Sequence, residues 1–357
     1  MKGLLHPVTI TFYVVSLIIS LPFILPDKST KIYTDTELRA AALSRDMLPV
    51  PKNYDDLLKV VDTIENPMSR KKIALGKKLF FDTLLSQDQT ISCASCHNLE
   101  EGGDDDITTA IGYKGQENPF HLNSPTVLNA ALAKAQFWNG RAKDVEEQAG
   151  GPIQAPFEMH MTPKEVLGRL KHVPKYVSTF QDVFGAEITF ENVRKAIGAY
   201  ERTLLTRGSY DNFLEGDNDA ITSAAKRGLS LFISKGCKGC HTGMSVGGQS
   251  IQKFPLRSYI VEYIGLLFSS NIAIKESPFP FENKGGFLGR DDNLRFRVPI
   301  LRNVTKTAPY FHNGSVEKLE EAVRIMSKYQ IGDEFTPKEI DDVVAFLKTL
   351  EGELVKY

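Results

Sequence analysis

The stretch Cys93-Ala94-Ser95-Cys96-His97 has a counterpart in Cys237-Lys238-Gly239-Cys240-His241, and the two together contain all four cysteines of the chain. Cys-x-x-Cys-His is the attachment signature of c-type haem. The two thiols form thioethers with the haem vinyl groups, and the adjacent histidine gives its imidazole to the iron. The motifs therefore predict two covalent haems, held by Cys93, Cys96, Cys237 and Cys240, with His97 and His241 as iron ligands.

Two other uses of paired cysteines fit these motifs less well. The cysteines of a structural zinc site lie close together in sequence, whereas these two pairs lie far apart. Zinc also does not require a histidine directly after each pair. A thioredoxin-like dithiol needs one Cys-x-x-Cys pair and not two. The spacing favours two haems over zinc or dithiol chemistry.

The N-terminal stretch predicts export. Lys2 supplies an early positive charge, Val8 to Leu25 contains no charged residue, and Pro26-Asp27-Lys28 ends the apolar run. This arrangement is typical of a secretory signal or a membrane anchor. The run is marginal for a span of about 20 residues, and no clear small-x-small cleavage site follows, which favours an uncleaved anchor. We assign residues 1–28 to a signal peptide or anchor and the remaining chain to a bacterial periplasm.

Length and charge bound the class of protein. The 357 residues carry a formal net charge of -1, so no bulk charge attracts nucleic acid or an anionic membrane surface. The chain is long enough for two domains. We expect an N-terminal haem domain over residues 31–207 and a C-terminal haem domain over 208–357. A linker is expected near residues 206–219, where Gly, Ser, Asp and Asn cluster.

Similar sequences precede the two haem motifs. Gly76 is followed three residues later by Leu79-Phe80, and Gly228 by Leu231-Phe232, each near the end of a helix-like apolar pattern. This similarity indicates an internal duplication with one haem in each module. Chance similarity between two amphipathic helices is the alternative.

Helical patterns dominate the chain, and strand signals are few. Thr162-Pro163 with Glu165, and Thr336-Pro337 with Glu339, carry the residues expected at a helix start. Gly/Pro/Asn-rich loops occupy residues 101–125 and 277–299. The fold class predicted is mainly α, with two cytochrome c-like haem domains, long loops and few or no strands. Helices are expected at residues 36–45, 70–81, 163–170, 190–205, 223–234, 316–329 and 337–351.

Several further blocks resemble the bacterial di-haem cytochrome c peroxidases and their MauG relatives. The resemblance covers residues 75–350, and its blocks are specific when taken together. They are Asn123-Ser124-Pro125-Thr126-Val127-Leu128-Asn129-Ala130, Gln136-Phe137-Trp138-Asn139-Gly140-Arg141-Ala142, Gly151-Pro152-Ile153-Gln154-Ala155 with Glu158-Met159, Leu301-Arg302-Asn303, and Thr307-Ala308-Pro309-Tyr310-Phe311-His312-Asn313-Gly314.

The resemblance implies different tasks for the two haems. The His97 haem would be the low-potential centre that meets peroxide, and the His241 haem the high-potential centre that accepts electrons. Met326 would be the distal ligand of the second haem, where a thioether raises the reduction potential. From the residues alone, Met326 reads as a core residue of an amphipathic helix.

The resemblance also implies three catalytic side chains. Glu158 would take a proton from one peroxide oxygen and return it to the other. Gln148 would hydrogen-bond the bound peroxide, and Trp138 would carry electrons between the haems. Without the resemblance these residues read as a solvated loop carboxylate, an exposed helix amide and a packing residue.

A calcium ion between the domains is a further implication. The side chain of Asn123 and the main-chain carbonyls of Thr307 and Pro309 would bind it, consistent with the oxygen ligands that calcium prefers. The resemblance also implies hydrogen peroxide as substrate, a small periplasmic cytochrome c or another one-electron donor, and a homodimer.

The loop after the first haem motif departs from the family pattern. The family commonly has a histidine just after a glycine here, and that histidine blocks the first iron until the second haem is reduced. This chain has Gly112-Tyr113, in a longer loop whose only histidine is His121. His121 as the sixth ligand is slightly favoured over an open site, and Tyr113 is the third alternative.

The sequence thus predicts a periplasmic di-haem peroxidase that reduces hydrogen peroxide to water. One alternative is a MauG-like enzyme that oxidises another protein, in which a tyrosine binds the second iron. Met326 at that position, with Tyr329 three residues on, favours the peroxidase. The other alternative is a di-haem electron-transfer cytochrome without peroxide chemistry.

Overall fold

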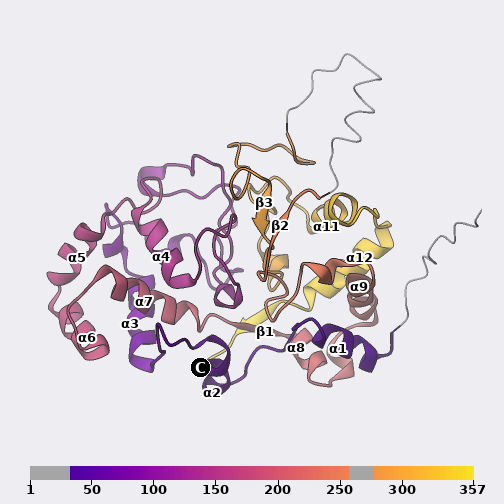
Figure 1. The fold of residues 1–357 in the computed structure, drawn as a ribbon, viewed down its shortest axis with the longest axis horizontal. Coiled ribbons are helices and arrows are strands. Elements are labelled where there is room, and N and C mark those ends of the chain that lie inside the picture. Colours follow the sequence, from indigo (N-terminus) through magenta and orange to yellow (C-terminus); the bar gives the residue numbers. More distant parts are fainter. Residues whose placement is uncertain (1–32, 257–276) are drawn as a thin grey trace, which may run out of the picture. The chain divides into compact units, whose positions relative to one another are not determined.

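The computed structural model describes residues 33–256 and 277–357. In this part of the chain the helices form two groups, joined by short strands (Figure 1). The predicted signal or anchor at residues 1–28 lies outside the described residues. Within them, no helix has both the length and the apolar character needed to cross a membrane.

The first group surrounds the first haem motif. Its core is a cluster of buried aliphatic and aromatic side chains that includes Leu79, Phe80 and Ile197. Pro163 and Pro174 occupy the first turns of two of its helices, where a missing N–H costs nothing. The helices are α3 (Arg70–Phe80), α4 (Val145–Gln154), α5 (Pro163–Lys171), α6 (Pro174–Phe184) and α7 (Phe190–Glu201).

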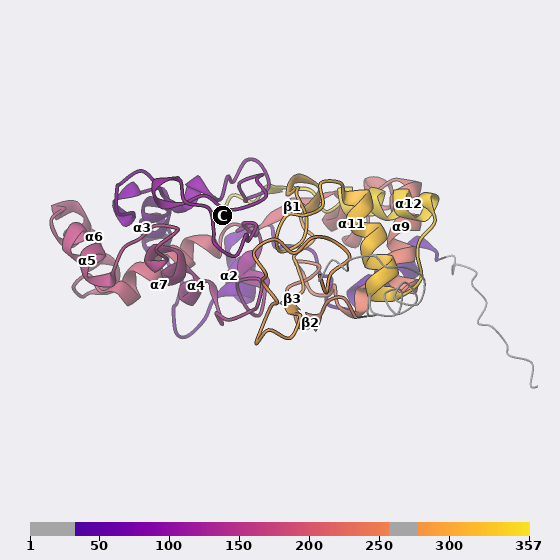
Figure 2. The ribbon, with the colours of Figure 1, turned by 90° about the horizontal axis from the view of Figure 1, so that it is seen from above.

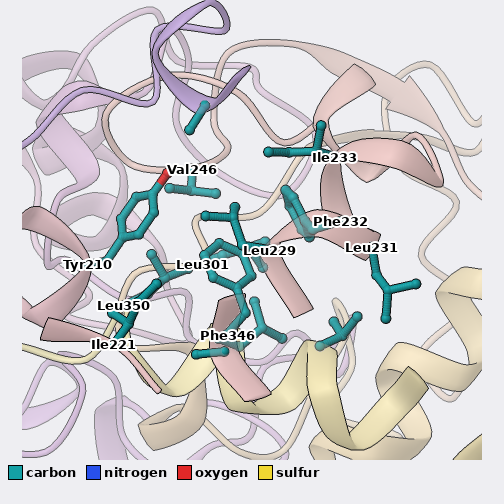
Figure 3. Close-up of a cluster of buried hydrophobic side chains, with 14 of the residues drawn as sticks. Tyr210, Ile221, Leu229, Leu231, Phe232, Ile233, Val246, Leu301, Phe346 and Leu350 are labelled. Carbon is teal, nitrogen blue, oxygen red and sulfur yellow. The ribbon is translucent and has the colours of Figure 1, made fainter. Parts of the chain in front are cut away.

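The second group surrounds the second haem motif. Figure 3 shows its core, in which Leu229 and Phe232 face Phe346. Leu38 and Ala42, which belong to the N-terminal part of the chain, are buried in the same cluster. The helices are α1 (Asp35–Leu43), α8 (Ser209–Leu214), α9 (Ser223–Ser234), α11 (Leu319–Ile325) and α12 (Pro337–Lys348).

One glycine in each group lets two helices cross backbone to backbone. A Cβ atom at Gly76 of α3 would lie 1.8 Å from the carbonyl oxygen of Ala196 in α7. A Cβ atom at Gly228 of α9 would lie 1.8 Å from the carbonyl oxygen of Asp342 in α12. These are the two glycines that the sequence comparison aligned. The repeated crossing supports the duplication hypothesis.

Four short strands form two antiparallel pairs, which Figure 2 shows between the helix groups. β1 (Thr206–Gly208) pairs with β4 (Gly352–Leu354), and β2 (Ile251–Lys253) pairs with β3 (Arg295–Arg297). The mainly helical class predicted from the sequence is confirmed.

The segment expected to be a linker is instead ordered secondary structure. It forms β1 and α8, and Asp211 within it is fully buried. The carboxylate of Asp211 makes two 2.8 Å contacts with the guanidinium of Arg302 and accepts hydrogen bonds from the main-chain N–H groups of Val50 and Gly208. Asp211 thus belongs to a buried ion pair, whereas Asn212 and residues 215–219 are exposed.

Most predicted helices are present, with corrected ends. The helix expected at 190–205 ends at Glu201, and the one expected at 316–329 is α11 followed by a π-helical turn, Met326–Ile331. Both predicted helix starts, at Thr162 and Thr336, are confirmed, and each forms a capping box. The sequence missed α4, which contains a proline, as well as α6, α8 and α2 (Tyr54–Val61).

Candidate functional site

Each Cys-x-x-Cys-His motif lines its own cavity. The first motif begins with a 3-10 turn, Cys93–Ser95, in the wall of one cavity. The second begins with the turn Cys237–Gly239, in the wall of another. Each cavity holds both cysteines and the histidine of its motif. The two cavities therefore fit the two haems predicted from the sequence.

The two motif histidines are held as neutral rings, the form that binds iron. Nδ1 of His97 lies 3.0 Å from the carbonyl oxygen of Gly103, which leaves Nε2 free for a metal. Burial lowers the pKa of His97, although the Gly103 hydrogen bond acts in the opposite direction. Burial also lowers the pKa of His241 to about 4.

The four thiols of the two motifs lack the lowered pKa that is typical of a redox-active dithiol. No disulfide joins them. Burial raises the pKa of Cys93, Cys96, Cys237 and Cys240, whereas a redox-active pair has a lowered thiol pKa. Among the described residues, no cluster of three or more Cys, His, Asp or Glu side chains could hold a metal ion.

Met326 and His241 line the same cavity. Met326 opens the π-helical turn that follows α11, and such turns are frequent at functional sites because they change the direction of a side chain. Tyr329, three residues on, is not among the residues that line this cavity. The structure thus brings together the two side chains expected on the second iron.

Glu158, Gln148 and Trp138 line the cavity of the first motif together with His97. Burial raises the pKa of Glu158, and the guanidinium of Arg141 opposes that shift. A raised pKa moves a carboxyl group towards the range in which it can both accept and return a proton. The first cavity therefore contains a buried carboxyl group and an amide.

Neither proposed ligand from the loop lines the first cavity. Nδ1 of His121 lies 3.2 Å from the hydroxyl oxygen of Thr109. The ring of Tyr113 stacks on His160 at 4.7 Å, and its main-chain N–H donates to the carbonyl of Glu158 at 2.7 Å. This loop therefore lies against Glu158, and the sixth ligand of the first iron stays a prediction.

The two cavities share a wall. Trp138, Arg297 and residues 123–126 line both of them. Nε1 of Trp138 donates a hydrogen bond to the carbonyl of Asn123 at 2.9 Å, and the carbonyl of Trp138 accepts one from the main-chain N–H of Arg297 at 2.7 Å. These two hydrogen bonds therefore fix both the indole ring and the main chain of Trp138 between the two cavities.

Three oxygen atoms proposed for calcium line the second cavity. The side-chain N–H of Asn123 donates to the carbonyl of Ile107 at 2.9 Å, so its Oδ1 is available. The main-chain oxygens of Thr307 and Pro309 accept no hydrogen bond from the part of the chain that the structure describes. Free carbonyl and amide oxygens are ligands that calcium accepts. These residues therefore fit the ion.

Three charged residues that line the cavities were assigned no function from the sequence. Arg141 opposes the pKa shift of Glu158. Glu201 is buried in the first cavity, and burial raises its pKa to about 8. Arg297 lies in the shared wall. For Glu201, the sequence signal was a charged residue at a position on the inward face of α7. For Arg297, it was the alternation of inward and outward side chains along β3.

Comparisons with known proteins identify the family of the chain. Residues 70–219 match the family described as di-haem cytochrome c peroxidase. The chain is 41% identical to the cytochrome c551 peroxidase of Pseudomonas aeruginosa, over 85% of this chain and 84% of that protein. It is 35% identical to the methylamine utilization protein MauG of Methylorubrum extorquens, over 81% of this chain and 80% of that protein.

A solved structure shows the same fold. It is a MauG-like protein associated with microbial copper homeostasis, 27% identical, with a TM-score of 0.67 over 82% of this chain and 93% of that one. Two c-type haem sites in a mainly helical fold define the class of protein. The chain belongs to the di-haem cytochrome c peroxidase family, and it is an enzyme of the cytochrome c peroxidase type.

Proposed function

We propose that this enzyme reduces hydrogen peroxide to two waters in the periplasm, with single electrons from a small cytochrome c or a similar donor. The observation that carries the proposal is the difference between the cavities. The described lining of the first cavity includes Glu158 and Gln148, whereas the described lining of the second includes Met326 and no carboxylate. This difference supports proton chemistry at the first site and electron storage at the second.

The chain's own residues would divide the work as follows. His97 and His241 would hold the irons, and the haems would supply two one-electron centres when bound. Glu158 would take the proton from the near oxygen of peroxide and give it to the departing oxygen. Gln148 would orient the peroxide by a hydrogen bond. Two protons and two electrons added to peroxide then give two waters.

Trp138 would serve electron transfer between the sites. It lies in the wall that both cavities share, and hydrogen bonds at its indole N–H and its carbonyl fix its position. Calcium bound by Asn123, Thr307 and Pro309 would stabilise the same wall. Replacing Trp138 with Phe, which keeps an apolar ring, should slow reduction of the first haem by electrons that enter at the second.

Steady-state turnover tests the proposed reaction. The enzyme should consume hydrogen peroxide when a reduced small cytochrome c is supplied, after prior one-electron reduction and in the presence of calcium. Glu158→Gln should lose most of that turnover while keeping both haems. Absence of turnover in the wild-type enzyme under these conditions would refute the proposed reaction.

The sixth position of the first iron requires a separate experiment. We retain His121 as the proposed ligand, which requires the loop to leave the position described above. Electron paramagnetic resonance of the oxidised protein, compared with His121→Ala and Tyr113→Phe, separates the three alternatives. An unchanged spectrum of the first haem in His121→Ala would eliminate His121.

A second candidate function is MauG-like oxidation of another protein. It requires a tyrosine ligand on the second iron, whereas this chain has Met326 at the matching position. Met326 lines the cavity, as does Tyr310, and Tyr329 does not. Met326→Leu should abolish a methionine-type spectrum of the second haem. An unaltered spectrum would favour the MauG-like alternative. The homodimer and the tether to the inner membrane remain proposals, to be tested by sedimentation and by cell fractionation.

A further inference from the structure

Arg297 is a buried cation in the wall between the two cavities. It belongs to β3, where Phe296 points to the aromatic cluster around His312. Arg295 at one end of the strand is exposed, whereas Arg297 is only 4% exposed. Arg297 lines both cavities. Its side chain is therefore buried in the wall that the two cavities share.

The guanidinium of Arg297 has no partner within the described protein. Its Nε and Nη1 atoms are buried and make no hydrogen bond. Two other buried arginines are paired with carboxylates, Arg202 with Glu146 at 2.7 Å and Arg302 with Asp211 at 2.8 Å. An unpaired buried charge is strongly unfavourable, so a residue retained in this state indicates an anion that binds there.

The charged groups around the two cavities indicate which kind of anion could bind Arg297. Burial is the only cause that lowers the pKa of Arg297, to about 10, so no carboxylate of the described chain acts on it. Glu158 and Glu201, which line the first cavity, form no ion pair with it among the described residues. Each haem, in contrast, brings two propionate carboxylates into its cavity.

We propose that Arg297 binds haem propionate at the shared wall and thereby sets the reduction potentials of the haems. A guanidinium presents N–H groups in a planar fork that matches a carboxylate. The proposal rests on the two haems and not on peroxide reduction. Its chemistry is a charge-assisted hydrogen bond, with no covalent step.

Two consequences follow from a fixed positive charge at this place. It favours the ferrous over the ferric state and so raises the potential of a nearby haem. It also keeps the propionate ionised, so that reduction of the iron is not accompanied by proton uptake there. Because the main-chain N–H of Arg297 also holds the carbonyl of Trp138, the same residue positions both the propionate and the tryptophan.

The test is a redox titration of the purified holoprotein, with haem content measured alongside. Arg297→Gln should lower the midpoint potential of at least one haem. It should also make that potential depend on pH around neutrality, because the unpaired propionate then binds a proton on reduction. Arg295→Gln, an exposed cation on the same strand, is the matched control and should leave both potentials unchanged.

Arg297→Lys provides the second arm, because the neutral variant could fail to retain two haems. Lysine keeps the charge near neutral pH, but burial lowers its pKa, so the potentials of this variant should fall at alkaline pH where those of the wild type do not. Unchanged potentials and pH dependence in Arg297→Gln overturn the proposal. If Arg297→Gln does not retain both haems, the proposal is overturned when the midpoint potentials of Arg297→Lys at alkaline pH equal those of the wild type.

These measurements involve no peroxide. Loss of peroxide turnover with normal potentials would therefore speak against the proposed function and not against the role of Arg297. Normal peroxide turnover with unchanged midpoint potentials in Arg297→Gln would speak against the role of Arg297 and not against the proposed function.

Discussion

Replacing Gly228 with alanine tests the helix crossing that supports the second haem motif. The added Cβ would lie 1.8 Å from the carbonyl oxygen of Asp342 and 2.5 Å from its carbonyl carbon, whereas Cβ atoms essentially never come closer than 3.0 Å to such atoms. The obstacle is backbone, so α9 and α12 must separate locally by at least 1.2 Å, the difference between 1.8 and 3.0 Å.

The expected cost follows from two opposing effects. Forcing packed elements apart costs about 3 kcal/mol at the upper end of overpacking substitutions. Alanine is favoured over glycine within a helix by about 1 kcal/mol. The net loss of unfolding free energy is therefore about 2 kcal/mol, which lowers Tm by about 3 °C for a unit of this length.

The assay is thermal unfolding of the holoprotein followed by circular dichroism, with haem content checked in each variant. Gly76→Ala should behave like Gly228→Ala, because its Cβ meets the carbonyl of Ala196 at the same distance. Gly168→Ala is the control: a Cβ there meets nothing within 4 Å, so Tm should rise slightly. A Gly228→Ala variant that unfolds at or above the wild-type temperature would refute the reasoning.

Four further predictions concern charges and the metal. Asp211→Asn leaves buried Arg302 without its counter-charge and should cost about 3–5 kcal/mol in urea unfolding, whereas Glu321→Gln, which loosens an exposed pair with Arg324, should change little. Peroxide reaction should accelerate with pH through a Glu158 pKa above the ordinary 4.5, and Glu158→Gln should remove this dependence with a loss of about 10²–10⁴-fold; a retained dependence in stopped-flow traces would exclude Glu158 as the base. Burial raises the pKa of Asp104 to about 8 from 3.8. Between these pH values the native state binds a proton that the unfolded state does not, so the free energy of unfolding should fall as pH rises from 3.8 to about 8. Asp104→Asn should make Tm less dependent on pH in thermal melts. Chelation of calcium should reduce electron transfer between the haems, calcium should restore it, and Asn123→Ala should weaken calcium binding measured by titration calorimetry.

Local chemistry made part of the site predictable. The haem motifs are contiguous, so their cavities could be inferred from the spacing alone, and the glycines before them carry a detectable repeat. Trp138 and Glu158 are far apart from the motifs in sequence. They could be assigned only through the resemblance, because no periodicity shows that a loop carboxylate faces a cavity.

Long-range pairing explains what the sequence did not reveal. Asp211 lies in a segment whose composition is typical of a linker, and its partner Arg302 is distant in sequence, so burial of the pair is visible only in the fold. Helix α4 was missed because Pro152 breaks the usual pattern, although its N-cap Asp144 fits a helix start. The unpaired burial of Arg297 is explained by a bound anion, and no sequence pattern indicates that an anion binds there.

The burial of α1 with the second helix group has a consequence for dissecting the protein. Leu38 and Ala42 fill the core around Leu229, while Leu354 packs against the core of the first group. The core of each helix group therefore includes a segment that a single cut between the groups would leave in the other fragment. A fragment starting at residue 208 would lack part of its own interior, so separately expressed halves are poor models of the individual haems. A single nick between the halves should accordingly leave the two pieces associated.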